Sequence, residues 1–186
     1  MGTFCLFLLA ALACSVLASS SLGSCFTCAS ARPECHGNCS YTCPPNWFLG
    51  VNNYCYAFGT NPEGQTWSEA EKICQDMGGH LASIDDAVQN EFIAVKAYQS
   101  RGYPQIWSGL YVDPKTKFFK WSDGCTTDFA NWASGQPIAP RTEMCVTITT
   151  KVQFVPFKLS GFEWALDSCD TKLPTTICMR APDVQG

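Results

Sequence analysis

Hydrophobic and polar positions first fall into a regular pattern between residues 66 and 79. Apolar side chains recur there at the spacing of one helix face, at Trp67, Ala70, Ile73, Cys74 and Met77. Thr66 and Glu69 are spaced as a capping box at the start of this segment. Gly78 and Gly79 can terminate it, because glycine readily takes the left-handed conformation of a helix end. The pattern therefore predicts an amphipathic helix.

A second helical pattern follows over residues 83–98. Ser83 and Asp86 have capping-box spacing, and Val88, Phe92 and Val95 are predicted to face inward. Beyond Gly102 the chain turns to short segments that are rich in β-branched and aromatic residues, which is typical of strands. These segments are KFFKW at 117–121, CVTITT at 145–150 and CMR at 178–180. Two early helices followed by strands and long loops predict an α+β fold.

The N-terminal segment predicts export from the cell. Residues 4–17 are apolar, and the small residue Ala18 lies at the position of a cleavage site, so residues 1–18 are interpreted as a signal peptide. The apolar run is shorter than the ~20 residues that a membrane-spanning helix needs. Because no Lys or Arg precedes it, an uncleaved membrane anchor is the alternative. The remaining chain divides into a Cys-rich leader (19–42), a main domain (43–180) and a short tail (181–186).

Cysteine usage fits a secreted protein. The chain has 13 cysteines, of which Cys5 and Cys14 leave with the signal peptide. So many thiols in an exported chain indicate disulfides. A zinc site built from Cys25, Cys28, Cys35 and His36 is the competing interpretation. In the same leader, Asn38 begins an Asn-Cys-Ser acceptor for N-glycosylation.

Charge and histidine content weaken two classes of function. The formal net charge of −4 disfavours nucleic acid as a partner, and the cluster of Lys115, Lys117 and Lys120 is interpreted as a solvated hairpin edge. His36 and His80 are the only histidines, and neither lies beside a nucleophile or paired carboxylates. We therefore expect no enzymatic activity.

Six segments, in order, resemble the C-type lectin-like domain family from Cys43 to about Arg180. They are CPPNWFLGVNNYCYAF, WSEAEKIC, GGHLASI, IWSGL, WSDGCTTDFANW and ICMR. The resemblance implies two helices, short antiparallel sheets, a long loop region and disulfide staples. Within IWSGL, Trp107 and Leu110 are expected in the core, with a close backbone approach at Gly109. The tryptophans are interpreted as packing rather than as ligand contacts: Trp47, Trp67, Trp107, Trp121 and Trp132.

The resemblance also implies three disulfides. These are Cys43–Cys55, Cys74–Cys178 and Cys145–Cys169. They leave five cysteines of the mature chain, at positions 25, 28, 35, 39 and 125. Because five thiols cannot all pair within one chain, Cys125 is predicted to form an interchain bridge and a covalent dimer. The alternative is a bridge from Cys125 back to the leader.

Sugar-binding members of the family hold calcium with five side chains, and this chain keeps two of them. Gln136 and Glu143 are retained, but Ile138 stands where a second ligand of the first loop belongs. After Trp164 the chain has Ala165 and Leu166 where Asn and Asp are expected, and Asp167 lies one residue too late for the same strand face. Calcium prefers six to eight oxygen ligands. The resemblance therefore predicts no metal cofactor, with calcium as the alternative.

Near this degenerate site the chain carries an apolar insertion. Phe154 and Phe157 flank Pro156, and they are interpreted either as buried strand or as a loop tip that contacts a ligand. The predicted function is a secreted recognition module for a glycan or protein ligand, with Gln136, Glu143, Phe154 and Phe157 as candidate contacts. A calcium-dependent lectin and a structural subunit of a disulfide-linked oligomer are the alternatives.

Overall fold

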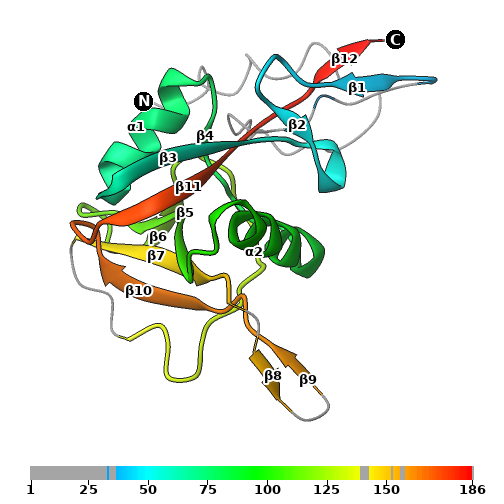
Figure 1. Ribbon diagram of the computed structural model, residues 1–186. Helices are drawn as coiled ribbons and strands as arrows, with labels where there is room; N and C mark the ends of the chain where they lie inside the picture. The colour runs from blue at the N-terminus through cyan, green and yellow to red at the C-terminus, as the bar shows by residue number, and fades with distance from the viewer. Residues whose placement is uncertain (1–32, 34–36, 139–142, 152, 156–157, 186) are drawn as a thin grey trace, which may run out of the picture.

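The computed structural model describes residue 33 and residues 37–138, 143–151, 153–155 and 158–185. The predicted signal peptide, most of the leader and Phe157 lie outside these residues. The described part is an α+β fold, as predicted, with two α-helices and one 3-10 turn among its strands (Figure 1). In chain order the elements are β1 (Ser40–Thr42), β2 (Phe48–Leu49), η1 (Val51–Asn53), β3 (Cys55–Gln65), α1 (Trp67–Asp76), β4 (His80–Leu81), α2 (Ala87–Arg101), β5 (Gln105–Val112), β6 (Phe119–Trp121), β7 (Met144–Thr149), β8 (Gln153–Val155), β9 (Lys158–Ser160), β10 (Trp164–Ser168), β11 (Leu173–Arg180) and β12 (Asp183–Gln185).

One eight-stranded sheet organises the domain. Its main path runs β10-β7-β5-β11-β3-β2, with β4 paired to β11 and β6 paired to β5. The β5–β11 pair is parallel, and the other pairs in the sheet are antiparallel. Two small ribbons lie outside the sheet. The β8–β9 hairpin projects from the lower end of the molecule, and β1 pairs with β12 at the opposite end (Figure 1).

Helix α1 forms as its sequence predicts. The backbone N–H of Glu69 donates to the Thr66 hydroxyl at 3.3 Å, and the backbone N–H of Thr66 donates to the Glu69 carboxylate at 2.8 Å. This reciprocal capping box satisfies two donors that the first turn leaves free, and it holds the pKa of Glu69 below its usual value. Gly78, with φ of +88°, follows the last turn.

Helix α2 begins later than the sequence predicted. Asp86 is the N-cap itself, accepting from the backbone N–H of Gln89 at 2.8 Å, so the proposed Ser83–Asp86 box is wrong. The buried face is also rotated. Ile93 and Ala97 are fully buried, whereas Val88, predicted to face inward, is 63% exposed. Phe92 still packs against the core as predicted, so the inward face is only partly the one expected.

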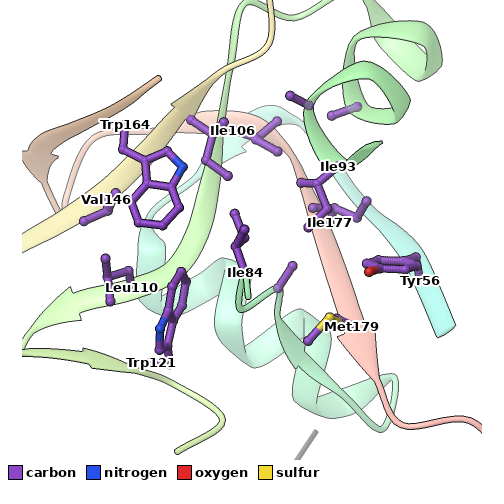
Figure 2. Close-up of a cluster of buried hydrophobic side chains, with 14 of the residues drawn as sticks. Tyr56, Ile84, Ile93, Ile106, Leu110, Trp121, Val146, Trp164, Ile177 and Met179 are labelled. Carbon is purple, nitrogen blue, oxygen red and sulfur yellow. The ribbon is translucent and has the colours of Figure 1, made fainter. Parts of the chain in front are cut away.

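The hydrophobic core lies on both sides of β11. The larger cluster includes Tyr56, Ile84, Ile106, Trp164 and Ile177, and Figure 2 shows these side chains converging between α2 and the sheet. In the smaller cluster Trp107 packs beside Cys74 and Cys178. Gly109 is close-packed as expected, because a Cβ added there would lie 2.7 Å from the carbonyl oxygen of Leu81.

Three disulfides staple the domain in the pairing that the family resemblance implied. Cys43 is bonded to Cys55, Cys145 to Cys169, and Cys74 to Cys178. The last bond joins α1 to β11 across a sequence separation of 104 residues. In the chain-entropy model, closing a loop of that length stabilises the fold by ~4–5 kcal/mol.

Candidate functional site

Gln136 lies in the loop between β6 and β7, and its peptide bond to Pro137 is cis. Its side-chain oxygen accepts hydrogen bonds from the backbone N–H of Ile138 at 3.3 Å and of Leu166 at 3.4 Å. The amide oxygen therefore ties this loop to the edge strand β10. Binding an ion through the same oxygen would compete with both donors.

The strand beside Gln136 does not supply the oxygens that a calcium site needs. Leu166 is 8% exposed and belongs to the core cluster. Ala165 and Asp167 flank it on the alternate, partly exposed face. The Asp167 carboxylate instead accepts from the backbone N–H of Ser168 at 2.7 Å and from the Thr171 hydroxyl at 2.9 Å. This carboxylate shapes the turn after β10.

Glu143, the second retained calcium position, attaches just beyond the end of β10. Its backbone oxygen accepts from the N–H of Cys169 at 3.1 Å, three residues beyond the attachment of Gln136 at Leu166. Three residues of strand correspond to about 10 Å. The exposed Glu143 also lines a separate cavity of about 290 Å³, beside Trp67 and Tyr111. The described residues contain no group of three acidic, His or Cys side chains that could hold a metal.

The remaining predicted sites are placed only in part. Phe154 lies in β8, but its side chain is outside the description, as is Phe157. Asn38 is exposed, as a glycosylation acceptor must be. Cys39 and Cys125 are both disulfide-bonded in the single chain. For Cys125 this favours the internal bridge over the predicted interchain bridge.

A groove of about 430 Å³ lies between β6 and the loop that follows it. We call this cavity the aromatic groove. Its lining includes the rings of Phe119, Trp121, Phe129, Trp132 and Trp164, together with Leu110, Lys120, Gly124, Cys125, Thr126, Thr127, Asp128 and Ala130. The volume falls within the range of small-ligand pockets, ~300–1,000 Å³.

Trp164, at the start of β10, is the centre of the aromatic cluster. Three rings meet it edge to face, with centroid distances of 5.8 Å for Trp121, 5.6 Å for Phe129 and 5.7 Å for Trp132. Trp121 and Trp164 are buried, whereas Phe129 and Trp132 are half-buried. The groove therefore has a rigid floor of two indoles, and its other rings form partly open walls.

One ion pair stands at the edge of the groove. The Lys120 ammonium donates to the Asp113 carboxylate. This bond, assisted by the backbone N–H of Lys115, lowers the pKa of Asp113, and the carboxylate in turn raises the pKa of Lys120. The charge of Lys120 is therefore already matched within the protein.

Sequence reasoning placed the candidate contacts at Gln136 and Glu143 and missed the aromatic groove. Trp121 and Trp132 do pack, as predicted, but they also line this open cavity. The segment WSDGCTTDFANW, one of the six that resemble the family, contains most of the groove lining. Its alternation of aromatic and polar residues was the available signal, but only the folded loop shows that the rings enclose a space.

The sequence profile of the Lectin C-type domain matches residues 63–180, and the chain belongs to this family of recognition domains. A C-type lectin 9a of Crotalus adamanteus is 31% identical over 149 residues, covering 77% of this chain and 84% of that one. An alpha-N-acetylgalactosamine-specific lectin of Patiria pectinifera is 36% identical over 122 residues, covering 60% and 70%. Family members are generally binding proteins rather than enzymes.

The solved structures agree with the fold. The carbohydrate-recognition domain of cow CD23, crystallised in the presence of a GlcNAc2Man3 oligosaccharide, superimposes with a TM-score of 0.60 at 25% identity. That match covers 76% of this chain and 98% of the cow domain. Within the described part of the chain, no helix is both long enough and apolar enough to cross a bilayer.

Proposed function

We propose that this protein is an extracellular recognition module that binds a glycan or protein ligand without a calcium-bridged sugar site. The proposal rests on the side-chain oxygen of Gln136, which already accepts hydrogen bonds from the backbone N–H groups of Ile138 and Leu166. The buried Leu166 stands where the family pattern requires a carboxylate. The backbone attachment points of the two retained residues, at Leu166 and Cys169, lie about 10 Å apart, which is unfavourable for a single six-oxygen shell.

Export from the cell is supported by several properties of the chain. The apolar segment at residues 4–17 predicts a signal peptide, and the three disulfides fit an oxidising compartment. Several relatives carry names of lectins, which favours a carbohydrate among the ligand classes. Cys125 is disulfide-bonded within the single chain, which favours a monomer over the covalent dimer expected from the sequence, and electrophoresis without reducing agent distinguishes the two.

Calcium titration tests the proposal directly. The unfolding temperature should be the same in calcium and in chelator, and binding to a glycan array should not change between the two conditions. The positive control is a family lectin with an intact calcium site. This lectin should lose both stability and binding in chelator. A rise of several degrees in the unfolding temperature at sub-millimolar calcium would contradict the proposal and favour the calcium-dependent lectin.

A further inference from the structure

The aromatic groove contains an indole N–H that the protein leaves unused. Trp121 is only 6% exposed, yet its Nε1 donates no hydrogen bond within the described residues. By contrast, the indole N–H groups of Trp67, Trp107 and Trp164 donate to Ser108, Gln65 and Asn90 at 2.8, 3.1 and 2.7 Å. A buried indole N–H usually has a partner. An unpaired one in a cavity wall therefore indicates an acceptor that comes from outside.

The Trp121 nitrogen is accessible rather than sealed in the core. It is not among the unpaired polar atoms of the described residues that are fully enclosed, which belong to Gln65, Ser122 and Thr176. Figure 2 shows this nitrogen on the edge of the ring that faces away from Ile84. Because Trp121 lines the groove, its donor is available to a bound molecule.

A second polar group of the groove is also unused. The carboxylate of Asp128 is exposed, lines the cavity and accepts no hydrogen bond from the described residues. Lys120, the one cation among the described lining residues, is engaged by Asp113. Among its described lining residues, the groove therefore offers the free indole N–H groups of Trp121 and Trp132, the free carboxylate of Asp128 and no unmatched positive charge.

We infer that the aromatic groove binds a short neutral saccharide. A sugar ring has an apolar C–H face, which fits against the half-buried rings of Phe119 and Trp132, whose centroids lie 5.2 Å apart. A sugar oxygen accepts from the Trp121 N–H, and two neighbouring hydroxyls donate to Asp128. The inference rests on the proposed recognition function and names its site and its ligand class.

Other occupants fit the groove less well. An aliphatic side chain of a protein partner would cover the rings but leave the Trp121 donor and the Asp128 carboxylate without partners, which is costly once water is excluded. A sialylated or sulfated sugar would bring a negative charge toward Asp128 with no free cation to compensate. The groove should therefore prefer neutral sugars to anionic ones.

NMR spectroscopy of the indole groups tests the inference on the complete secreted protein. The chain has six tryptophans, so a ¹⁵N-labelled sample gives six indole N–H signals that single substitutions can assign. Glucose, galactose, mannose, N-acetylglucosamine and N-acetylgalactosamine would each be titrated in the presence of chelator. At least one of these sugars should shift the Trp121 and Trp132 signals and leave those of Trp107 and Trp164 in place.

Two substitutions and two matched controls connect the shift to the groove. Trp121→Phe keeps an aromatic ring at this position but removes the N–H, and Asp128→Asn removes the charge of the acceptor. Each should weaken sugar binding about three- to tenfold, which is the range for one hydrogen bond. Trp47→Phe and Asp170→Asn make the same changes outside the groove and should leave the affinity unchanged. The remaining indole signals show whether each variant is folded.

The outcomes separate this inference from the function proposed above. If sugar binds in chelator with the same affinity in Trp121→Phe and Asp128→Asn, the groove is not the sugar site. Calcium-independent recognition would still be supported. Binding that requires calcium but still depends on both residues would refute calcium independence and retain the groove. If all five sugars leave the Trp121 and Trp132 signals in place at high millimolar concentration, the saccharide inference is wrong.

Discussion

The loop at Gln136 and the aromatic groove both carry polar groups, but the two regions use them differently. At Gln136 the side-chain oxygen is occupied by two backbone donors, so it holds the loop against β10. In the groove, the Trp121 N–H and the Asp128 carboxylate have no partner among the described residues. A residue type that matches a family's ligand position is therefore weaker evidence of binding than an accessible polar atom that the fold has left unsatisfied.

If this difference is correct, changes to occupied polar groups should reduce stability, and changes to unoccupied ones should reduce binding. Glu71 is the strongest example of the first kind. Its buried carboxylate accepts from His80 Nδ1 at 2.6 Å, from the backbone N–H of Leu81 at 2.9 Å and from Gln75 at 2.9 Å.

Glu71→Ala should therefore have the largest effect. It leaves the buried N–H of Leu81 without an acceptor and should lower the free energy of unfolding by about 3 kcal/mol. Urea denaturation measures this loss. Glu91→Ala, an exposed helical control, should change stability by less than ~0.5 kcal/mol. Equal effects of the two substitutions would mean that the hydrogen bonds of Glu71 contribute little.

Gln136→Ala should have a smaller effect of the same kind. The two hydrogen bonds that it removes are long, so the expected loss of unfolding free energy is about 1 kcal/mol. Sugar affinity in chelator should be unchanged, in contrast to Asp128→Asn. Gln99→Ala, on the exposed surface of α2, is the matched control. A loss of ligand binding without a loss of stability would reverse the roles assigned to the loop and the groove.

The ion pair beside the groove predicts a dependence on pH. Because folding lowers the pKa of Asp113, the unfolded chain binds a proton at this position more readily than the folded chain does. The pair therefore stabilises the fold above the ordinary Asp pKa of about 4, and this stabilisation is lost as the pH falls below that value. Unfolding curves at pH 6 and in mild acid should show a smaller acid loss for Asp113→Asn than for the natural chain.

Val88→Ala should have the smallest effect. Val88 is 63% exposed, so its truncation should change the free energy of unfolding by less than ~0.5 kcal/mol. Ile93→Ala, on the buried face of the same helix, should cost about 2–4 kcal/mol. Comparable losses of unfolding free energy for the two variants would mean that Val88 faces the core, as the sequence pattern predicted.

The sequence predicted best where one local interaction decides the structure. The capping box at Thr66 and Glu69 needs only its own turn, and α1 begins where it was expected. At α2 both Ser83 and Asp86 could cap the first turn, and in the structure Asp86 is the N-cap. Asp86 also accepts from the side chain of Asn52 at 2.9 Å, a contact 34 residues away that periodicity cannot reveal.

The candidate site was harder to predict because it depends on which atoms remain unpaired. Family resemblance located Gln136, but its two donors include Leu166, on a strand 30 residues further along the chain. The aromatic groove is likewise assembled from β6, the following loop and the start of β10. Burial of Trp121 could be read from its motif, whereas the open edge at its nitrogen could not.

The Cys74–Cys178 bond has a mechanical consequence. If an exported protein is pulled between its two ends, tension passes directly from α1 to β11 through this bond. The 104-residue separation that it closes, which contains β5, β6, β7 and β10, is then excluded from the stretched path. The oxidised domain can thus bear force at its ends while the groove keeps its shape.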